Sequence, residues 1–208
     1  MSKDDFIVFG QPLIEKDEID EVADSLRKAW LGSGPKVSQF ENEFAIYKNA
    51  PHATALNSCT AALHLSCLAL ELEPGDEVIT TAMTFCATVN AIIHSGATPV
   101  LADIDPITWN IDPQDIERKI APKTRAIVPV HFAGRACDMD SIMQITKKHN
   151  LRIIEDCAHA IETEYKGKKT GTFGDLGVFS FYATKNLVTG EGGMVISEDE
   201  EKISRSKR

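Results

Sequence analysis

The sequence has no apolar stretch long enough to cross a membrane, and it has no basic run or stripe. Its first residues carry acids where a secretory signal needs basic residues, and their apolar run is too short for the core of a signal peptide. The net charge of -9 over 208 residues argues against nucleic acid or an anionic membrane as a partner. Small molecules are therefore the expected ligands.

Cysteine pairs are also missing. The chain has five cysteines and no C-x-x-C spacing among them: Cys59, Cys67, Cys86, Cys137 and Cys157. An odd number of thiols without such a pair predicts reduced cysteines and a cytoplasmic protein. A metal site formed by His131, Cys157 and His159 is conceivable, but their spacing matches no usual ligand motif. We therefore expect no metal.

The G-x-G-x-x-G fingerprint of dinucleotide-binding folds is absent, because N-S-C-T-A follows the first expected strand. This absence argues against a nicotinamide-dependent dehydrogenase. Internal repeats and low-complexity linkers are lacking as well. With 43% hydrophobic and 25% charged residues, the chain has the composition of a globular protein with one substantial core.

Two amphipathic helices are expected near the start, over residues 14–30 and about 37–47, with L-G-S-G-P between them. We expect these helices to form an arm over residues 1–50. Gly32 and Gly34 could bring the connecting loop close to a ligand, although a simple turn between two helices also explains them.

Short strand-like runs alternate with helical runs from residue 52 onward, which predicts a wound α/β sheet. The expected strands cover residues 53–56, 77–80, 98–102, 126–130, 152–155, 177–181 and 194–197. The expected helices between them cover residues 60–70, 87–94, 113–120 and 139–149. Residues 51–208 are therefore expected to form one large domain around a seven-stranded sheet.

The strongest chemical signal lies in residues 178–193, V-F-S-F-Y-A-T-K-N-L-V-T-G-E-G-G. Lys185 directly follows an apolar strand and is flanked by Ser180, Thr184 and a glycine-rich turn. A lysine whose surroundings favour the neutral amine can attack a carbonyl to form a Schiff base. The alternative is a solvated lysine at the start of a loop.

Further candidates follow other expected strands, where ligands bind in open α/β sheets. Small and hydroxyl residues at Cys59 and Thr60 open a helix, whose free N–H groups attract phosphate, although Asn57 or Ser58 could simply cap it. Phe85 could stack on a flat heterocycle or belong to the core. Asp156 could hold a charged partner or cap a helix. Together these groups and Ser180 are the parts that pyridoxal 5'-phosphate requires.

Six blocks of the sequence resemble the DegT/DnrJ/StrS-type sugar aminotransferases, which are pyridoxal phosphate-dependent enzymes of fold type I. They are N-S-C-T-A-A-L-H-L, P-G-D-E-V-I-T-T-A-M-T-F-C-A-T, A-D-I-D, P-V-H-F-A-G, I-I-E-D-C-A-H-A and F-S-F-Y-A-T-K-N-L-V-T-G-E-G-G. The resemblance covers essentially the whole chain. It implies the large domain of that fold, with a seven-stranded, mainly parallel sheet and helices on both faces.

The resemblance also implies roles for individual residues. Lys185 is the catalytic residue and forms the Schiff base with the cofactor, Asp156 pairs with the pyridine nitrogen, and Phe85 lies against the ring face. His159 stands near the ring or its hydroxyl, where many members have glutamine. The phosphate is held by Cys59, Thr60 and Ser180. Cys59 occupies a position where glycine is common, which a backbone N–H contact tolerates.

The activity implied is transfer of an amino group from an amino acid, expected to be glutamate, to a nucleotide-linked keto-sugar in amino-sugar or polysaccharide biosynthesis. Family members are about twice as long, so we expect the carboxyl-terminal small domain to be absent here and a homodimer to form at full length. One alternative is a truncated, non-catalytic fragment or partner subunit. Another is a sugar dehydratase of the same family. The resemblance implies histidine at the position of Lys185 in those enzymes, so Lys185 argues against this alternative.

Overall fold

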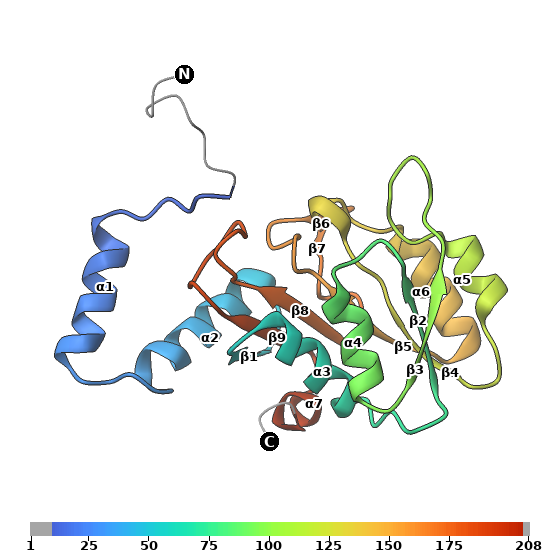
Figure 1. Ribbon diagram of the computed structural model, residues 1–208, viewed down its shortest axis with the longest axis horizontal. Coiled ribbons are helices and arrows are strands. Elements are labelled where there is room, and N and C mark those ends of the chain that lie inside the picture. Colours follow the sequence, from blue (N-terminus) through green and yellow to red (C-terminus); the bar gives the residue numbers. More distant parts are fainter. Residues whose placement is uncertain (1–9, 206–208) are drawn as a thin grey trace.

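The computed structural model describes residues 10–205 and is built around a mixed sheet of seven strands (Figure 1). The strands lie in the order β1-β9-β8-β5-β4-β2-β3. Their bounds are β1 His52–Leu56, β2 Glu77–Thr81, β3 Thr98–Ala102, β4 Thr124–Val128, β5 Arg152–Asp156, β8 Leu176–Ser180 and β9 Gly193–Ser197. Only β9 runs against its two neighbours, β1 and β8. The expected seven-stranded, mainly parallel sheet is confirmed.

Helices cover both faces of this sheet. Their bounds are α1 Lys16–Arg27, α2 Pro35–Lys48, α3 Cys59–Ala69, α4 Cys86–His94, α5 Pro113–Lys119, α6 Met139–His149 and α7 Glu200–Arg205. One core lies between the sheet and α3, α4 and α7. On the opposite face α5 and α6 cover the β2–β5 side, and α2 covers β8 and β9. This arrangement is the three-layered α/β architecture expected from the sequence.

Alternation of side chains along each central strand separates the two cores. Ile154 of β5 packs on the α3 face, whereas its neighbour Ile153 packs on the α6 face. Val178 and Phe179 of β8 divide in the same way between the α3 face and the α2 face. Because neighbouring strand residues point to opposite faces, central strands need apolar residues at successive positions. Runs such as R-I-I-E-D satisfy that requirement.

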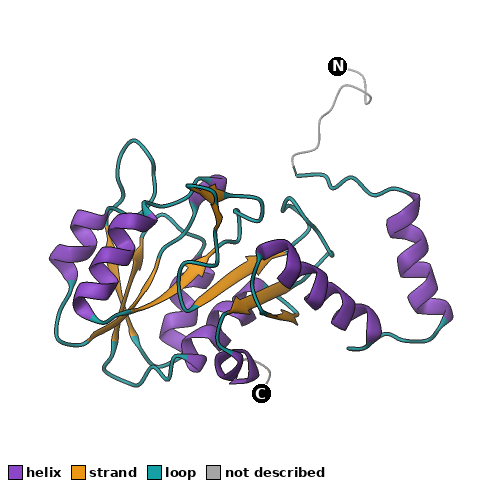
Figure 2. Ribbon diagram, turned by 180° about the vertical axis from the view of Figure 1, so that it is seen from behind, coloured by secondary structure: helices purple, strands orange, loops and turns teal. Residues whose placement is uncertain are grey.

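The two N-terminal helices differ in how they contact the sheet. Phe44 of α2 is buried and lies edge-on to Phe179 and Phe181, with ring centroids 5.0 and 5.5 Å away. In contrast, α1 has no buried residue and exposes Ile19, Val22 and Leu26. Both views show α1 standing apart, with α2 between it and the sheet (Figures 1 and 2).

The strand ends differ from expectation by one or two residues. β4 ends at Val128, because Pro129 has no N–H to continue the ladder, and Val130 then forms an isolated bridge with Asp156. A short hairpin of β6 (Glu164–Tyr165) and β7 (Lys168–Lys169) was not expected. Its turn places Lys166 and Gly167 at positive φ, as a type I′ turn requires. Two-residue strands are too short to produce a detectable alternation.

None of the helices described within residues 10–205 is long and apolar enough to cross a membrane.

Candidate active site

A cavity of about 510 Å³ lies at the carboxyl ends of the parallel strands. Its walls come from the segments that follow β1, β2, β5 and β8, together with Val130 after β4. All seven residues predicted for the site line this cavity: Cys59, Thr60, Phe85, Asp156, His159, Ser180 and Lys185. The fold therefore brings together residues that lie up to 126 positions apart in the sequence.

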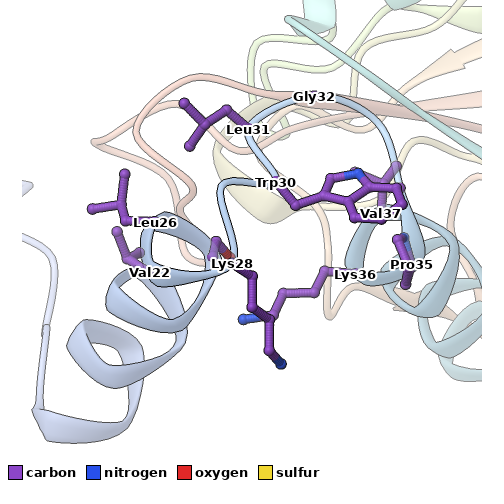
Figure 3. A pocket seen from close by; sticks show the side chains of 11 residues that line it. Val22, Leu26, Lys28, Trp30, Leu31, Gly32, Pro35, Lys36 and Val37 are labelled. Carbon is purple, nitrogen blue, oxygen red and sulfur yellow. The ribbon is translucent and has the colours of Figure 1, made fainter.

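Another cavity, of about 380 Å³, lies between α1 and α2 (Figure 3). Its described lining is mainly apolar and contains no carboxylate, histidine or cysteine. The indole N–H of Trp30 donates to the carbonyl of Ser33 at 3.1 Å, and a Cβ on Gly34 would lie 1.9 Å from that indole nitrogen. The glycine is thus explained by a tight helix-to-helix turn against Trp30, the simpler of the two expectations.

The start of α3 forms one wall of the active-site cavity. Ser58 is the N-cap, and its hydroxyl accepts a hydrogen bond from the Ala61 N–H at 3.1 Å. Cys59 and Thr60 are the first residues of the helix, where backbone N–H groups have no partner within the helix. Burial raises the pKa of the Cys59 thiol well above its usual value, so the thiol is neutral. This wall offers N–H and hydroxyl donors to an anion.

Asp156 ends β5 and is 4% exposed. Its Oδ2 accepts a hydrogen bond from the Thr88 hydroxyl at 2.8 Å, and its Oδ1 accepts one from the Ala158 N–H at 3.1 Å. The Thr84 and Thr88 hydroxyls lie 2.7 Å apart, which extends the network. No helix begins at Asp156, because a turn follows it, so the helix-cap alternative does not apply. A buried carboxylate held by fixed donors can bind a cationic N–H group.

Lys185 lies on the loop after β8, and its backbone N–H donates to the Tyr182 carbonyl at 2.9 Å. Its side chain is partly buried, in contrast to the solvated lysine of the alternative prediction. Burial lowers the pKa of the Lys185 amine, while the negative charge of Asp156 opposes that shift. A lowered pKa increases the neutral fraction of the amine, which is the form that attacks carbonyl groups.

Two rings, those of Phe85 and His159, also line the cavity. Burial and the positive charge of Lys185 lower the pKa of His159, and its ring centroid lies 6.3 Å from that of Phe132. Phe85 is the N-cap residue of α4 and is 75% exposed, so its ring stands at the rim outside the core. The Ser180 hydroxyl accepts a hydrogen bond from the Tyr182 N–H at 3.4 Å.

Four residues that were not predicted to belong to the site also line the cavity: Thr84, Thr88, Tyr182 and Thr184. A usable signal was present for two of them. Thr84 and Thr88 are four residues apart around the start of α4, directly after a strand. That spacing places both hydroxyls on one side of the helix, toward the carboxyl end of the sheet.

Among the described residues, the histidine, cysteine and acidic side chains close enough to share a metal ion are His131, Glu155 and Cys157. His159, proposed above as a conceivable ligand with His131 and Cys157, lies in the active-site cavity instead. Both oxygens of Glu155 and both ring nitrogens of His131 already have hydrogen-bond partners within the protein. These atoms are therefore committed to the fold.

The chain is similar in sequence to known proteins. The sequence profile of the DegT/DnrJ/EryC1/StrS aminotransferase family matches residues 12–208. The spore coat polysaccharide biosynthesis protein SpsC of Bacillus subtilis is 56% identical over 94% of this chain and 50% of its own length. GDP-perosamine synthase of Caulobacter vibrioides is 43% identical over 97% of this chain and 54% of its own length.

Solved structures show the same fold. The aminotransferase of Psychrobacter cryohalolentis superposes with a TM-score of 0.93 at 41% identity, over 95% of this chain and 51% of that one. The PLP form of the putative sugar aminotransferase Spr1654 of Streptococcus pneumoniae gives a TM-score of 0.92 at 39% identity, over 97% of this chain and 57% of that one. The chain thus spans about half the length of the relatives it matches.

Proposed function

The chain belongs to the DegT/DnrJ/EryC1/StrS aminotransferase family, and on that premise we propose that it is the large domain of a pyridoxal phosphate-dependent sugar aminotransferase. The enzyme transfers an amino group from an amino acid, glutamate, to a nucleotide-linked keto-sugar in amino-sugar or polysaccharide biosynthesis. The observation that carries this proposal is that Lys185 and Asp156 line one cavity together with the start of α3.

The residues around the cavity fit pyridoxal phosphate in their chemistry. Cys59 and Thr60 offer N–H groups at a helix N-terminus, and Ser180 adds a hydroxyl, so these three would hold the phosphate. The carboxylate of Asp156 is buried and oriented by Thr88 and Ala158, so it would hold the protonated pyridine nitrogen. The family resemblance implies the same role for each of these residues.

The remaining residues act on the ring and the reacting atoms. Lys185 would bind the cofactor through its amine, whose lowered pKa favours the reactive neutral form. Once released, the same amine would move a proton between the substrate carbon and the C4′ carbon of the cofactor. Phe85 would cover one ring face, and His159 would lie beside the ring hydroxyl. When bound, pyridoxal phosphate supplies the electron sink for these proton transfers.

Other features of the proposal follow from the family. We infer that residues 10–50 belong to a helical arm, that residues 51–205 belong to the cofactor-binding domain, and that the enzyme acts in the cytoplasm. The predicted arm and domain also include residues 1–9 and 206–208, which lie outside the described part of the chain. Relatives of about twice this length support a further small domain that completes the sugar-nucleotide site, with a homodimer as the assembled enzyme. Lys185 favours amine transfer over dehydration of the sugar.

Chemical trapping tests the proposal. The chain is mixed with pyridoxal phosphate and reduced with borohydride, and the labelled residue is identified by mass spectrometry. We expect the label on Lys185 and none in Lys185→Ala, whereas Lys147→Ala, which removes an exposed lysine outside the cavity, should label as the wild type does. Label distributed over surface lysines would contradict the proposal and favour a non-catalytic fragment. Release of a keto acid from glutamate then separates transamination from dehydration.

A further inference from the structure

A fully buried pair of side chains, Glu155 and His131, lies directly behind the candidate active site. Both side chains are 0% exposed, and the imidazole Nε2 lies 3.1 Å from Glu155 Oε2. The mechanism proposed above uses neither residue. A carboxylate removed from water is costly unless hydrogen bonds replace its solvation, so this pair requires a structural or functional reason.

Four hydrogen bonds within the protein replace the water that the buried carboxylate of Glu155 has lost. Its Oε2 accepts from His131 Nε2 and from the Gly171 N–H at 2.8 Å. Its Oε1 accepts from the N–H groups of Phe173 at 2.6 Å and Gly174 at 2.8 Å. Burial alone would raise the pKa of Glu155, but the bonds from His131 and from the loop N–H groups lower it below its usual value. The carboxylate is therefore ionised and holds the loop of residues 171–174.

His131 is fixed by its other ring nitrogen. Nδ1 accepts a hydrogen bond from the Cys137 N–H at 3.1 Å, so the proton of the ring is on Nε2 and is donated to Glu155. Both nitrogens are thus engaged, and rotation of the ring would break both bonds. The imidazole links Glu155 to the segment after β4.

The same segment holds the backbone of Asp156. The Asp156 N–H donates to the Pro129 carbonyl at 2.9 Å, and the His131 N–H donates to the Asp156 carbonyl at 3.1 Å. Glu155 and Asp156 are neighbours on β5, so their side chains point to opposite faces of the sheet. The carboxylate in the cavity is therefore supported from behind by its neighbour and by residues 129–131.

We propose that Glu155 and His131 are positioning residues of the active site, which fix the backbone of Asp156 so that its carboxylate would be held in place for the cofactor ring nitrogen. Glu155 achieves this by joining three segments, residues 129–131, β5 and the loop 171–174. This inference rests on the proposed function, since the ring nitrogen belongs to pyridoxal phosphate. The fixing of Asp156 itself is a property of the chain without cofactor.

The substitution Glu155→Gln tests the proposal, because it keeps the shape but replaces one acceptor oxygen by a donor that faces N–H groups. We expect faster amide hydrogen exchange at Asp156 and His131, measured by NMR without cofactor. We also expect the dissociation constant for pyridoxal phosphate to rise by about ten- to a hundredfold, by analogy with the loss of groups that orient metal ligands. The pH midpoint of the bound cofactor's absorbance should shift too. Glu164→Gln, an exposed residue of β6, is the matched control.

A second pair of variants covers the case in which Glu155→Gln does not fold. His131→Gln retains an N–H donor for Glu155, whereas His131→Leu removes it. We expect His131→Gln to resemble the wild type in amide exchange and cofactor binding. His131→Leu should show the changes expected for Glu155→Gln. The inference would be overturned if His131→Gln and His131→Leu behaved alike. It would also be overturned if the variants lowered the melting temperature but left amide hydrogen exchange and the pH midpoint of the cofactor absorbance unchanged. Failure of the wild type to bind cofactor would reject the proposed function instead, and amide exchange would still decide this inference.

Discussion

The hydroxyl of Thr88 donates a 2.8 Å hydrogen bond to the carboxylate of Asp156, which lies 68 residues later in the chain. Thr88 belongs to α4 and Asp156 ends β5, so the hydrogen bond joins a helix and a strand that are distant in the sequence and meet at the cavity. Both residues are nearly without exposed surface. The orientation of the acidic group is therefore set by a hydroxyl that has no part in the predicted cofactor contacts.

We expect Thr88→Val to lower the free energy of unfolding by about 1–3 kcal/mol, because a buried carboxylate loses a donor. Cofactor binding should weaken as well, since Asp156 can then rotate. Urea unfolding and titration with pyridoxal phosphate measure the two effects. Thr98→Val, at an exposed position of β3, is the matched control. Equal stability and affinity in both variants would contradict the assigned role of Thr88.

The pKa of Lys185 should respond to Asp156. Burial lowers this pKa, while the negative charge of Asp156 partly offsets the shift. Asp156→Asn removes that offsetting charge, so the amine should lose its proton at a still lower pH. Reductive methylation of Lys185 followed against pH gives the midpoint, with Glu164→Gln as a control for loss of a distant charge. A midpoint that rises or stays unchanged would contradict this electrostatic coupling.

Lys48 should give the stability a pH dependence in the alkaline range. It is 0% exposed, and its Nζ donates to the Ile161 carbonyl at 3.0 Å. Burial lowers the pKa of Lys48 from its usual value of 10.5. Between the lowered pKa and 10.5 the unfolded chain binds more protons than the folded chain, so this contribution to stability rises with pH. The contribution of Lys48 to stability is least favourable at pH values below the pKa of Lys48 in the folded protein.

The substitution Lys48→Met isolates that contribution. We expect the difference in free energy of unfolding between Lys48→Met and the wild type to change with pH across this window and to be constant below it. Lys147→Met, at an exposed position of α6, should show no such dependence. Chemical unfolding at a series of pH values provides the measurement, and parallel curves for the wild type and Lys48→Met would reject the prediction.

A glycine at the start of β9 allows the close approach of α3 to the sheet. A Cβ on Gly193 would lie 2.4 Å from the Ser58 carbonyl carbon, at the N-cap of the helix that borders the cavity. We expect Gly193→Ala to cost about 1–3 kcal/mol of stability through overpacking and to weaken cofactor binding by displacing Ser58. Gly32→Ala is the control, since nothing lies within 4 Å of its Cβ position. Thermal unfolding of the two variants decides between local crowding and a general effect of alanine.

Several features of the site were predictable because they depend on local sequence. Strand-forming runs followed by polar residues predicted that Cys59, Thr60, Phe85, Asp156, Ser180 and Lys185 meet beyond the carboxyl ends of the strands, and these residues do line one cavity. The family resemblance added His159, which lines the same cavity. A cap at Asn57 or Ser58 likewise follows from residue type and position, and the structure shows that Ser58 is the N-cap of α3. The exposure of Phe85 was not predictable, because the sequence does not show whether a ring after a strand is covered.

By itself, the sequence determined the alternation of strands and helices, the family resemblance and the set of polar groups at the strand ends, since each depends on neighbouring residues. The tertiary structure decided the reversed direction of β9, the packing of α2 against the sheet and the contacts that orient Asp156. Those contacts join Thr88 to Asp156 and His131 to Glu155, and each pair comes from two different segments of the chain. A hydrogen bond between distant segments depends on how strands are ordered and helices rotated, and local residue patterns do not encode either.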